Sequence, residues 1–241
     1  MAVNKISKTD LSLINGIAGR PVADLAKIND EGIGGGGFIP DIFGDSSCKY
    51  AFDYEDNLTE LINDAAPTST VGTITYADDK FATGKSAVFT STQTQQYAIT
   101  TTLTFPFTVS AWIYAPTGMP AGAIFDNNFR MINMAPAYIK AYSQQTGRRF
   151  NPTFLLNLDA WNLLIVDFLS VDVTNMWLNG VKETPSYSAN NDTYSSSNLC
   201  IGSRDNYRDT RFAGKLDRYR IFNRDITDGE AAILLAEFNG S

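Results

Sequence analysis

The sequence of 241 residues contains no histidine. Histidine is the commonest general base and a frequent metal ligand at neutral pH, so its absence excludes Ser-His and Cys-His catalytic pairs and the usual zinc and copper sites. Cysteine is almost as rare, because Cys48 and Cys200 are the only two. In a chain that we expect to be made in a reducing cytoplasm, we predict that both are free thiols.

Charge and long apolar runs are scarce as well. Charged residues make up 19% of the chain, and the net charge is −7. Nucleic acid and anionic membranes require a basic patch, so this balance argues against both as main partners. No stretch reaches the roughly 18–20 apolar residues of a membrane span. The N-terminus also lacks the charged-then-apolar pattern of a secretion signal, so we expect neither a span nor export.

The first 31 residues contain one short apolar phrase twice. "DLSLING" at 10–16 returns fourteen residues later as "DLAKIND" at 24–30. Its apolar positions, which include Leu11, Ile14, Leu25 and Ile28, are too few to form a core, so another surface must bury them. Residues 1–31 therefore form an arm that either folds back on its own domain or docks on a neighbouring subunit, and we favour docking. Residues 32–47 begin with five glycines in six positions and predict a flexible linker.

We expect residues 48–241 to form the folded domain. Hydrophobic residues make up 44% of the whole chain, which is enough for a sizeable core. Segments rich in Val, Ile, Thr and aromatic residues, separated by Gly, Pro, Asn and Asp, predict β-strands. These segments are "TVGTITY" (70–76), "SAVFT" (86–90), "QYAIT" (96–100), "FTVSAWIYAP" (107–116), "NLLIVDFLS" (162–170), "TNMWLNGV" (174–181), "LCIGS" (199–203) and "GKLDRYRIF" (214–222). Within them, Asn179-Gly180 predicts a type I′ hairpin.

One helix is expected near the C-terminus. It begins at Thr227, and Glu230 three residues later completes a capping box. Its apolar face is expected to contain four consecutive residues, Ala232, Ile233, Leu234 and Leu235. Many short strands followed by one helix predict an all-β, two-sheet antiparallel sandwich.

The later segments resemble the concanavalin A-like lectin/glucanase superfamily, and most of all its laminin-G-like jelly-roll branch. The most specific motif is Phe-x-Gly-x-Leu-Asp-x-x-Arg-Ile-Phe-Asn at 212–223, and the second is Trp161 with Leu-Asn-Gly at 178–180. The resemblance covers about 50–238 and implies a jelly-roll sandwich. Strand alternation would place Asp217 inward, on the face of Tyr219 and Ile221. A buried carboxylate there must accept backbone N–H bonds or pair with a cation, so we expect a structural role.

The doubled phrase before the glycines is similar to the openings of some tailed-phage virion proteins. This second resemblance implies a virion structural protein, as a capsid decoration, tail or fibre component. Such a protein would be made in the host cytoplasm and held in several copies against other virion proteins by its arm, with its sandwich displayed toward host-surface carbohydrate. The alternative is a free-standing carbohydrate-binding lectin domain of a bacterial surface protein, in which the arm would be dispensable.

No catalytic residues are expected. Glucanases of the superfamily carry Glu-x-Asp-x-(x)-Glu on one strand, which aims the carboxylates at a single glycosidic bond. Glu55, Asp56 and Glu60 have the wrong spacing for this motif, while Asp167 and Asp172 are separated by a strand end and its turn.

Loops at the rim of the sandwich are the candidate binding sites. Tyr207 beside Asp205 and Asn206, and Tyr187 and Tyr194 in the preceding loop, offer rings for stacking on sugars and polar groups for their hydroxyls. Oxygen-rich stretches at 126–128, 190–192 and 205–209 leave one calcium ion open as an alternative to ordinary turn chemistry, with no ligands assigned.

Overall fold

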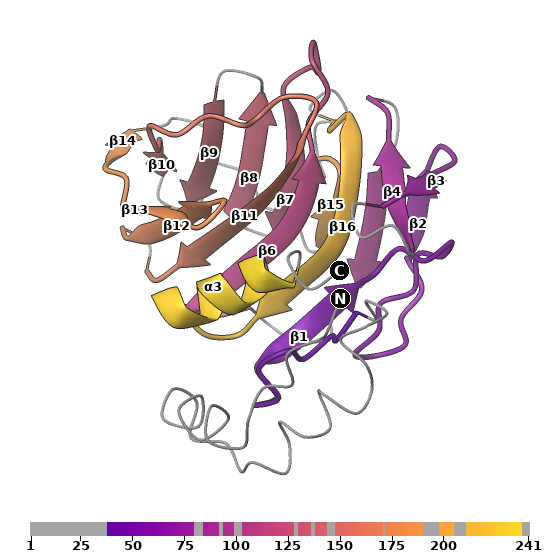
Figure 1. The fold of residues 1–241 in the computed structure, drawn as a ribbon, viewed down its shortest axis with the longest axis horizontal. Helices are drawn as coiled ribbons and strands as arrows, with labels where there is room; N and C mark the ends of the chain where they lie inside the picture. Colours follow the sequence, from indigo (N-terminus) through magenta and orange to yellow (C-terminus); the bar gives the residue numbers. More distant parts are fainter. Residues whose placement is uncertain are drawn as a thin grey trace, which may run out of the picture.

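Two antiparallel sheets stack face to face, and one helix lies against the outside of the first sheet (Figure 1). The computed structural model describes residues 38–79, 84–91, 94–98, 103–127, 130–135, 138–143, 148–170, 172–189, 198–204 and 211–237. The arm positions Leu11, Ile14, Leu25 and Ile28 lie outside the described residues. Within those ranges, no helix is long and apolar enough to cross a bilayer.

The first sheet has the strand order β13-β12-β11-β6-β16-β4-β3, and β1 also pairs with β16. Its strands are β1 (Cys48–Phe52), β3 (Thr75–Asp78), β4 (Lys85–Phe89), β6 (Phe107–Tyr114), β11 (Trp161–Phe168), β12 (Thr174–Leu178), β13 (Val181–Glu183) and β16 (Gly214–Phe222). The expected hairpin joins β12 to β13, because Asn179 and Gly180 both have positive φ, at 51° and 85°. β11 is covered on both faces, as its continuous apolar run predicts.

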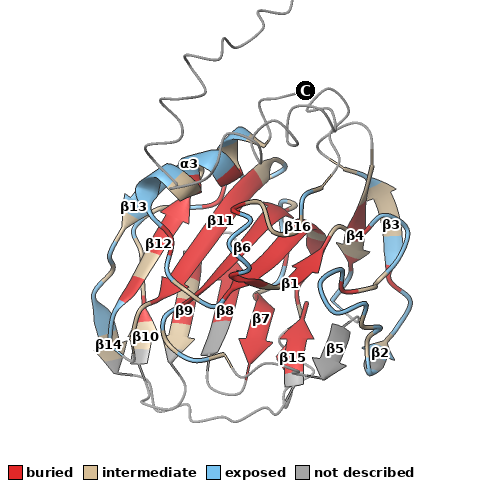
Figure 2. Ribbon diagram, turned by 90° about the horizontal axis from the view of Figure 1, so that it is seen from below, coloured by how far each residue is buried: buried red, intermediate tan, exposed pale blue. Residues whose placement is uncertain are grey.

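The second sheet has the order β14-β10-β9-β8-β7-β15-β5-β2, which Figure 2 shows from one edge to the other. Its strands are β2 (Ser69–Val71), β5 (Thr94–Ala98), β7 (Gly122–Asn127), β8 (Arg130–Ala135), β9 (Tyr138–Ser143), β10 (Arg148–Phe150), β14 (Tyr187–Ala189) and β15 (Asn198–Ile201). The prediction of one strand over 70–76 is wrong. The chain has a positive φ of 71° at Gly72, and it crosses there from β2 in the second sheet to β3 in the first.

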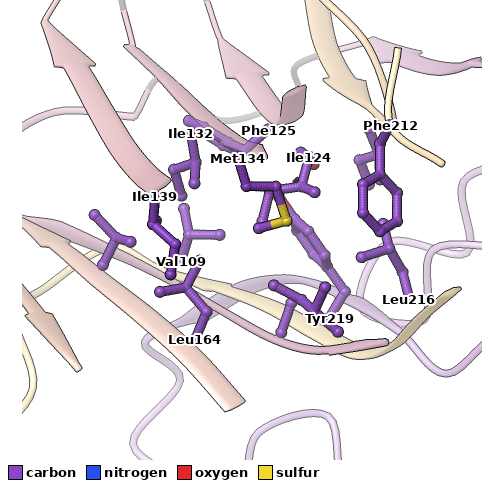
Figure 3. Close-up of a cluster of buried hydrophobic side chains, with 14 of the residues drawn as sticks. Val109, Ile124, Phe125, Ile132, Met134, Ile139, Leu164, Phe212, Leu216 and Tyr219 are labelled. Carbon is purple, nitrogen blue, oxygen red and sulfur yellow. Dashed lines mark hydrogen bonds between the residues drawn. The ribbon is translucent and has the colours of Figure 1, made fainter. Parts of the chain in front are cut away.

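The main core fills the space between the two sheets (Figure 3). Val109 and Leu164 of the first sheet face Phe125 and Ile132 of the second, and all four are buried. Burial of each such side chain contributes roughly 1.5–3 kcal/mol relative to exposure. The all-β, two-sheet jelly-roll prediction is therefore confirmed.

A second apolar cluster covers the outer face of the first sheet. Trp112, Trp177 and Phe222 project from that face and are covered by Leu234 of the helix α3 (Asp228–Ala236) and by Phe43. Residues 38–43, at the end of the expected linker, thus pack on the sandwich beside α3. The free state of the two buried cysteines, Cys48 and Cys200, agrees with the sequence prediction.

Helix α3 begins as predicted and turns part of its expected face toward the sheet. The hydroxyl of Thr227 accepts the N–H of Glu230, and the Glu230 carboxylate accepts the N–H of Thr227, so the capping box is present. The buried residues are Ala231 and Leu234, whereas Ile233 is 40% exposed. The expected face is confirmed for Leu234 and for Leu235, which is partly buried against the same cluster. It is wrong for Ala232 and Ile233, which are exposed, because four consecutive residues cannot all lie on one side of a helix.

Candidate functional site

The structure describes one of the residues expected to bind glycan. Tyr187 lies in the edge strand β14 opposite Phe150 of β10, and half of it is exposed. The two rings meet edge to face with centroids 6.3 Å apart. Asp205, Asn206, Tyr207 and Tyr194 lie outside the described residues, so their grouping with Tyr187 stays a prediction.

The stretch at 126–128, expected as an oxygen-rich rim loop, is in part a buried strand. Asp126 and Asn127 are the last residues of β7 and pair with β8 on one side and β15 on the other. The loop expectation is wrong for these two residues because they complete a ladder instead of turning the chain. The stretches at 190–192 and 205–209 are not described. In the part of the chain that is described, no three Cys, Asp or Glu side chains are placed to hold a metal ion.

Two buried carboxylates of the first sheet have structural partners. Glu60 accepts the backbone N–H groups of Ala51, Ile62 and Asn63 at 2.7–2.9 Å and so fastens the loop after β1. Asp167 accepts the hydroxyl of Thr108, and burial raises its pKa to about 7. Both groups hold backbone or side chains of their own sandwich.

The inward orientation expected for Asp217 is wrong. The pairing of β16 with β6 shifts between Asp217, which is opposite Trp112, and Arg220, which is opposite Ser110. The extra residue in this bulge, with Arg218 at a positive φ of 43°, reverses the alternation and places Asp217 on the outer face of the sheet, with Trp112. Its structural role is supported, since its carboxylate accepts the Arg218 N–H at 2.7 Å.

The outer faces of the two sheets differ in chemistry. The first is apolar and covered by α3, as described above. On the second, residues that alternate with the core project away from it. Ile139 and Ala141 of β9 belong to the main core, so Tyr138, Lys140 and Tyr142 point outward. Figure 2 shows that α3 lies on the far side of the sandwich from this sheet.

We define the polar face as Asn133 of β8, Tyr138, Lys140 and Tyr142 of β9, and Arg149 of β10. The strand register brings these five together. Asn133 is directly opposite Lys140, Tyr142 is directly opposite Arg149, and Tyr138 follows on the same side of β9. Directly opposite side chains in antiparallel strands lie about 5 Å apart at Cβ, so one small ligand could touch several of them.

The contacts on the polar face leave polar atoms unused. Lys140 Nζ lies 3.6 Å from the centre of the Tyr138 ring. Asn133 is 6% exposed, and its Oδ1 has no hydrogen-bond partner among the described residues. Arg149 Nε likewise has no hydrogen-bond partner within the described ranges. Buried polar atoms are normally satisfied, and each unsatisfied one costs about 1–3 kcal/mol.

This arrangement is suited to binding a hydroxyl-rich molecule. Tyrosine rings offer apolar faces, while Lys140 and Arg149 offer donors. Sequence reasoning missed the polar face because β7 to β10 were not expected as strands. The signal was nevertheless present in "YIKAYS" at 138–143, where Tyr, Lys and Tyr alternate with Ile and Ala.

Solved structures of low sequence identity share this fold. Domain 4 of AbnA, a GH43 extracellular arabinanase from Geobacillus stearothermophilus solved with arabinotriose, aligns with a TM-score of 0.61 and 18% identity over 78% of this chain and 98% of its own. The binding domain of botulinum neurotoxin DC with SialylT aligns at 0.59 and 12% identity, over 80% of this chain and 51% of its own. The binding domain of Paraclostridial Mosquitocidal Protein 1 gives 0.60 and 14%, over 80% and 52%. The chain thus spans about half of each toxin domain.

Sequence comparison assigns the family. No curated protein sequence matches the chain. A laminin G family profile, described as concanavalin A-like lectin/glucanases superfamily, matches residues 68–232, which is more than half of the chain. This range contains most strands of both sheets and the start of α3. The chain therefore belongs to the concanavalin A-like lectin/glucanases superfamily, as a laminin-G-like jelly-roll domain.

Proposed function

We propose that the protein is a non-catalytic carbohydrate-binding module of a tailed-phage virion, held on the particle by its N-terminal arm and displaying the polar face to host-surface glycan. The observation that carries glycan binding is the polar face itself. It combines partly exposed tyrosine rings with two cations, Lys140 and Arg149, that form no ion pair in the described part of the chain. The complexes of AbnA domain 4 with arabinotriose and of the neurotoxin domain with SialylT support the proposal, because they place glycan ligands on related folds.

The place where the arm joins the sandwich supports display. Arg220 is 1% exposed and donates to the carbonyl oxygens of Ile39 and Pro40, and its guanidinium lies 4.1 Å from the centre of the Phe38 ring. We call residues 38–40 the root of the arm. The root lies on the outer face of the first sheet, since Arg220, which binds it, is paired with Ser110 there. The polar face is on the opposite side of the sandwich. A subunit attached through residues before Phe38 would thus turn its polar face away from the particle.

Two features support a role without catalysis. The sequence lacks histidine and the carboxylate motif of the superfamily's glucanases. The buried carboxylates Glu60, Asp167 and Asp217 are each engaged with their own backbone or side chains. A binding module needs only a rigid face with unpaired polar groups, and the two-sheet core provides that rigidity.

Binding of the fluorescently labelled full chain to intact candidate host cells tests the proposal, with calcium present and then with a chelator. Saturable binding supports an adhesion module, and loss with the chelator would indicate a calcium ion in the rim loops. The absence of binding by the folded protein would contradict glycan recognition and leave a passive decoration protein.

Deletion of residues 1–37 tests the virion role. We expect the shortened chain to keep its fold, because the described packing begins at Phe38, and to lose incorporation into particles. If the shortened chain still assembles normally, the docking arm is refuted. Glycan binding without any need for the arm would then favour the alternative, a free-standing lectin domain.

A further inference from the structure

Most cations of the first sheet and its helix are paired with carboxylates. Lys85 binds Asp78, and Lys182 binds Asp228, at 2.7 and 2.9 Å. The arginines around α3 are paired in the same way, Arg218 and Arg220 with Glu237 and Arg224 with Asp45 and Glu230. Most of the positive charges on that side of the sandwich are therefore neutralised by the protein itself.

The cations of the polar face are not paired in this way. Among the described residues, neither Lys140 nor Arg149 forms an ion pair with a carboxylate, and the Lys140 ammonium lies over the Tyr138 ring. Asp126 points to the same face, but it lies in β7, two strands from Lys140 and three from Arg149, which is about 10 and 14 Å at the usual strand spacing. The face thus has two uncompensated positive charges on a protein of net charge −7.

Lys140 and Arg149 are close enough to affect one another. They are diagonal neighbours across β9 and β10, because Arg149 is opposite Tyr142, two residues from Lys140. Partial burial, and then the charge of Arg149, lower the pKa of Lys140. An anion placed between the two cations would remove this repulsion.

We propose that the polar face selects acidic glycans, with the sugar carboxylate held between Lys140 and Arg149. This inference rests on the proposed function and adds the class of ligand. A uronate or sialate carboxylate accepts charge-assisted hydrogen bonds from both cations, which are stronger than bonds between neutral groups. The Tyr138 ring keeps the ammonium of Lys140 in position beside the sugar.

Nucleic acid fits this face less well. Tight binding to a phosphate backbone uses about 6–10 cation contacts, and the described residues place two unpaired cations here. The net charge of −7 repels an extended polyanion over the rest of the surface. The polar face is therefore better suited to binding one carboxylate group of a sugar beside a tyrosine ring.

An array of polygalacturonate, alginate and hyaluronan, each immobilised beside its carboxyl-reduced form and beside duplex DNA, tests the inference with the full-length chain. We expect at least one acidic polymer to bind ten times more tightly than its reduced form, with affinity falling as salt increases. Lys140→Gln and Arg149→Gln should each weaken that binding about tenfold, as loss of one charge-assisted hydrogen bond does. The matched control is Lys215→Gln, which removes a lysine that lies over the Tyr114 ring at 5.3 Å in the first sheet.

The outcomes separate the two proposals. Equal affinity for acidic and reduced polymers, or unchanged binding by both polar-face variants, overturns the choice of acidic glycans and leaves glycan binding standing. DNA bound as tightly as the acidic polymers also overturns it. Failure of every polymer to bind refutes glycan binding and this inference together. Urea unfolding midpoints equal to wild type confirm that the variants are folded.

Discussion

The carboxyl of Asp53 should make the protein less stable at pH 8 than at pH 5. Asp53 directly follows β1, and burial, followed by the charge of Glu55, raises its pKa to about 7 from an ordinary value of 3.8. Asp217 lies on the same side of the sheet, and its charge interacts with that of Asp53. Because the folded-state pKa is raised, the unfolded chain loses its proton first as the pH increases. Stability therefore decreases between about pH 4 and pH 7 and is constant above that range.

The size of this effect follows from the pKa. A rise of about three units corresponds to roughly 4 kcal/mol at about 1.4 kcal/mol per unit. This is an upper limit, because Asp53 is only half-buried and shares its environment with Asp217. Asp53→Asn removes the titration at nearly the same volume, so we expect the variant to gain about 2 kcal/mol over wild type at pH 8 and nothing at pH 4.

Urea unfolding between pH 4 and pH 9, followed by the fluorescence of the buried Trp112 and Trp177, measures this difference. Asp159→Asn is the control, since hydrogen bonds from Thr117 lower the pKa of that carboxyl and its titration falls below the tested window. The Asp53→Asn variant still shows some dependence of its stability on pH, because the pKa of Asp167 is also raised to about 7. A variant no more stable than wild type at pH 8 would refute the reasoning.

Two further substitutions test the packing around the site. Arg220→Met should cost about 3–5 kcal/mol in urea unfolding, because it leaves the buried Glu237 carboxylate without its partner at 2.7 Å, whereas Arg224→Met, at a half-exposed pair, should cost about 1 kcal/mol or less. Equal losses would show that the root of the arm is not specially fixed. Gly202→Ala should cost about 3 kcal/mol in thermal unfolding, because φ is +81° and the new Cβ would lie 2.4 Å from the Phe89 ring. Gly118→Ala, at a similar φ of +77° in open space, should cost about 1 kcal/mol, and a loss as large as that of Gly202→Ala would contradict the role of the clash.

Features set by neighbouring residues were predictable from sequence. The Asn179-Gly180 hairpin and the Thr227–Glu230 capping box each depend on a few adjacent positions, and both are present. The continuous apolar run of β11 indicated a strand covered on both faces, and the second sheet covers one face while α3 and residues 38–43 cover the other. Such signals act through backbone sterics and local hydrogen bonds, so distant parts of the chain do not alter them.

Features that depend on pairing across the sheet were not predictable in the same way. The bulge that reverses Asp217 arises where β16 meets β6, more than a hundred residues away in the sequence. β7 to β10 were missed because their outward positions hold Asp, Asn, Lys and Tyr, which resemble loop composition when the partner strands are unknown. The polar face was hidden for the same reason. A strand that presents polar groups for binding has the weakest strand signal.

The contrast between the two outer faces is the strongest physical argument for a binding role. A helix and residues 38–43 cover the first face, so its apolar residues contribute to stability. On the second face, Asn133 and Arg149 retain buried atoms without partners among the described residues, and each such atom costs about 1–3 kcal/mol. Replacing these side chains with apolar ones would remove that cost. Buried atoms without such partners also occur in the first sheet, at Ser110 and Thr174. What distinguishes the second face is that two cations without carboxylate partners among the described residues lie beside partly exposed tyrosine rings, on the side opposite the root of the arm.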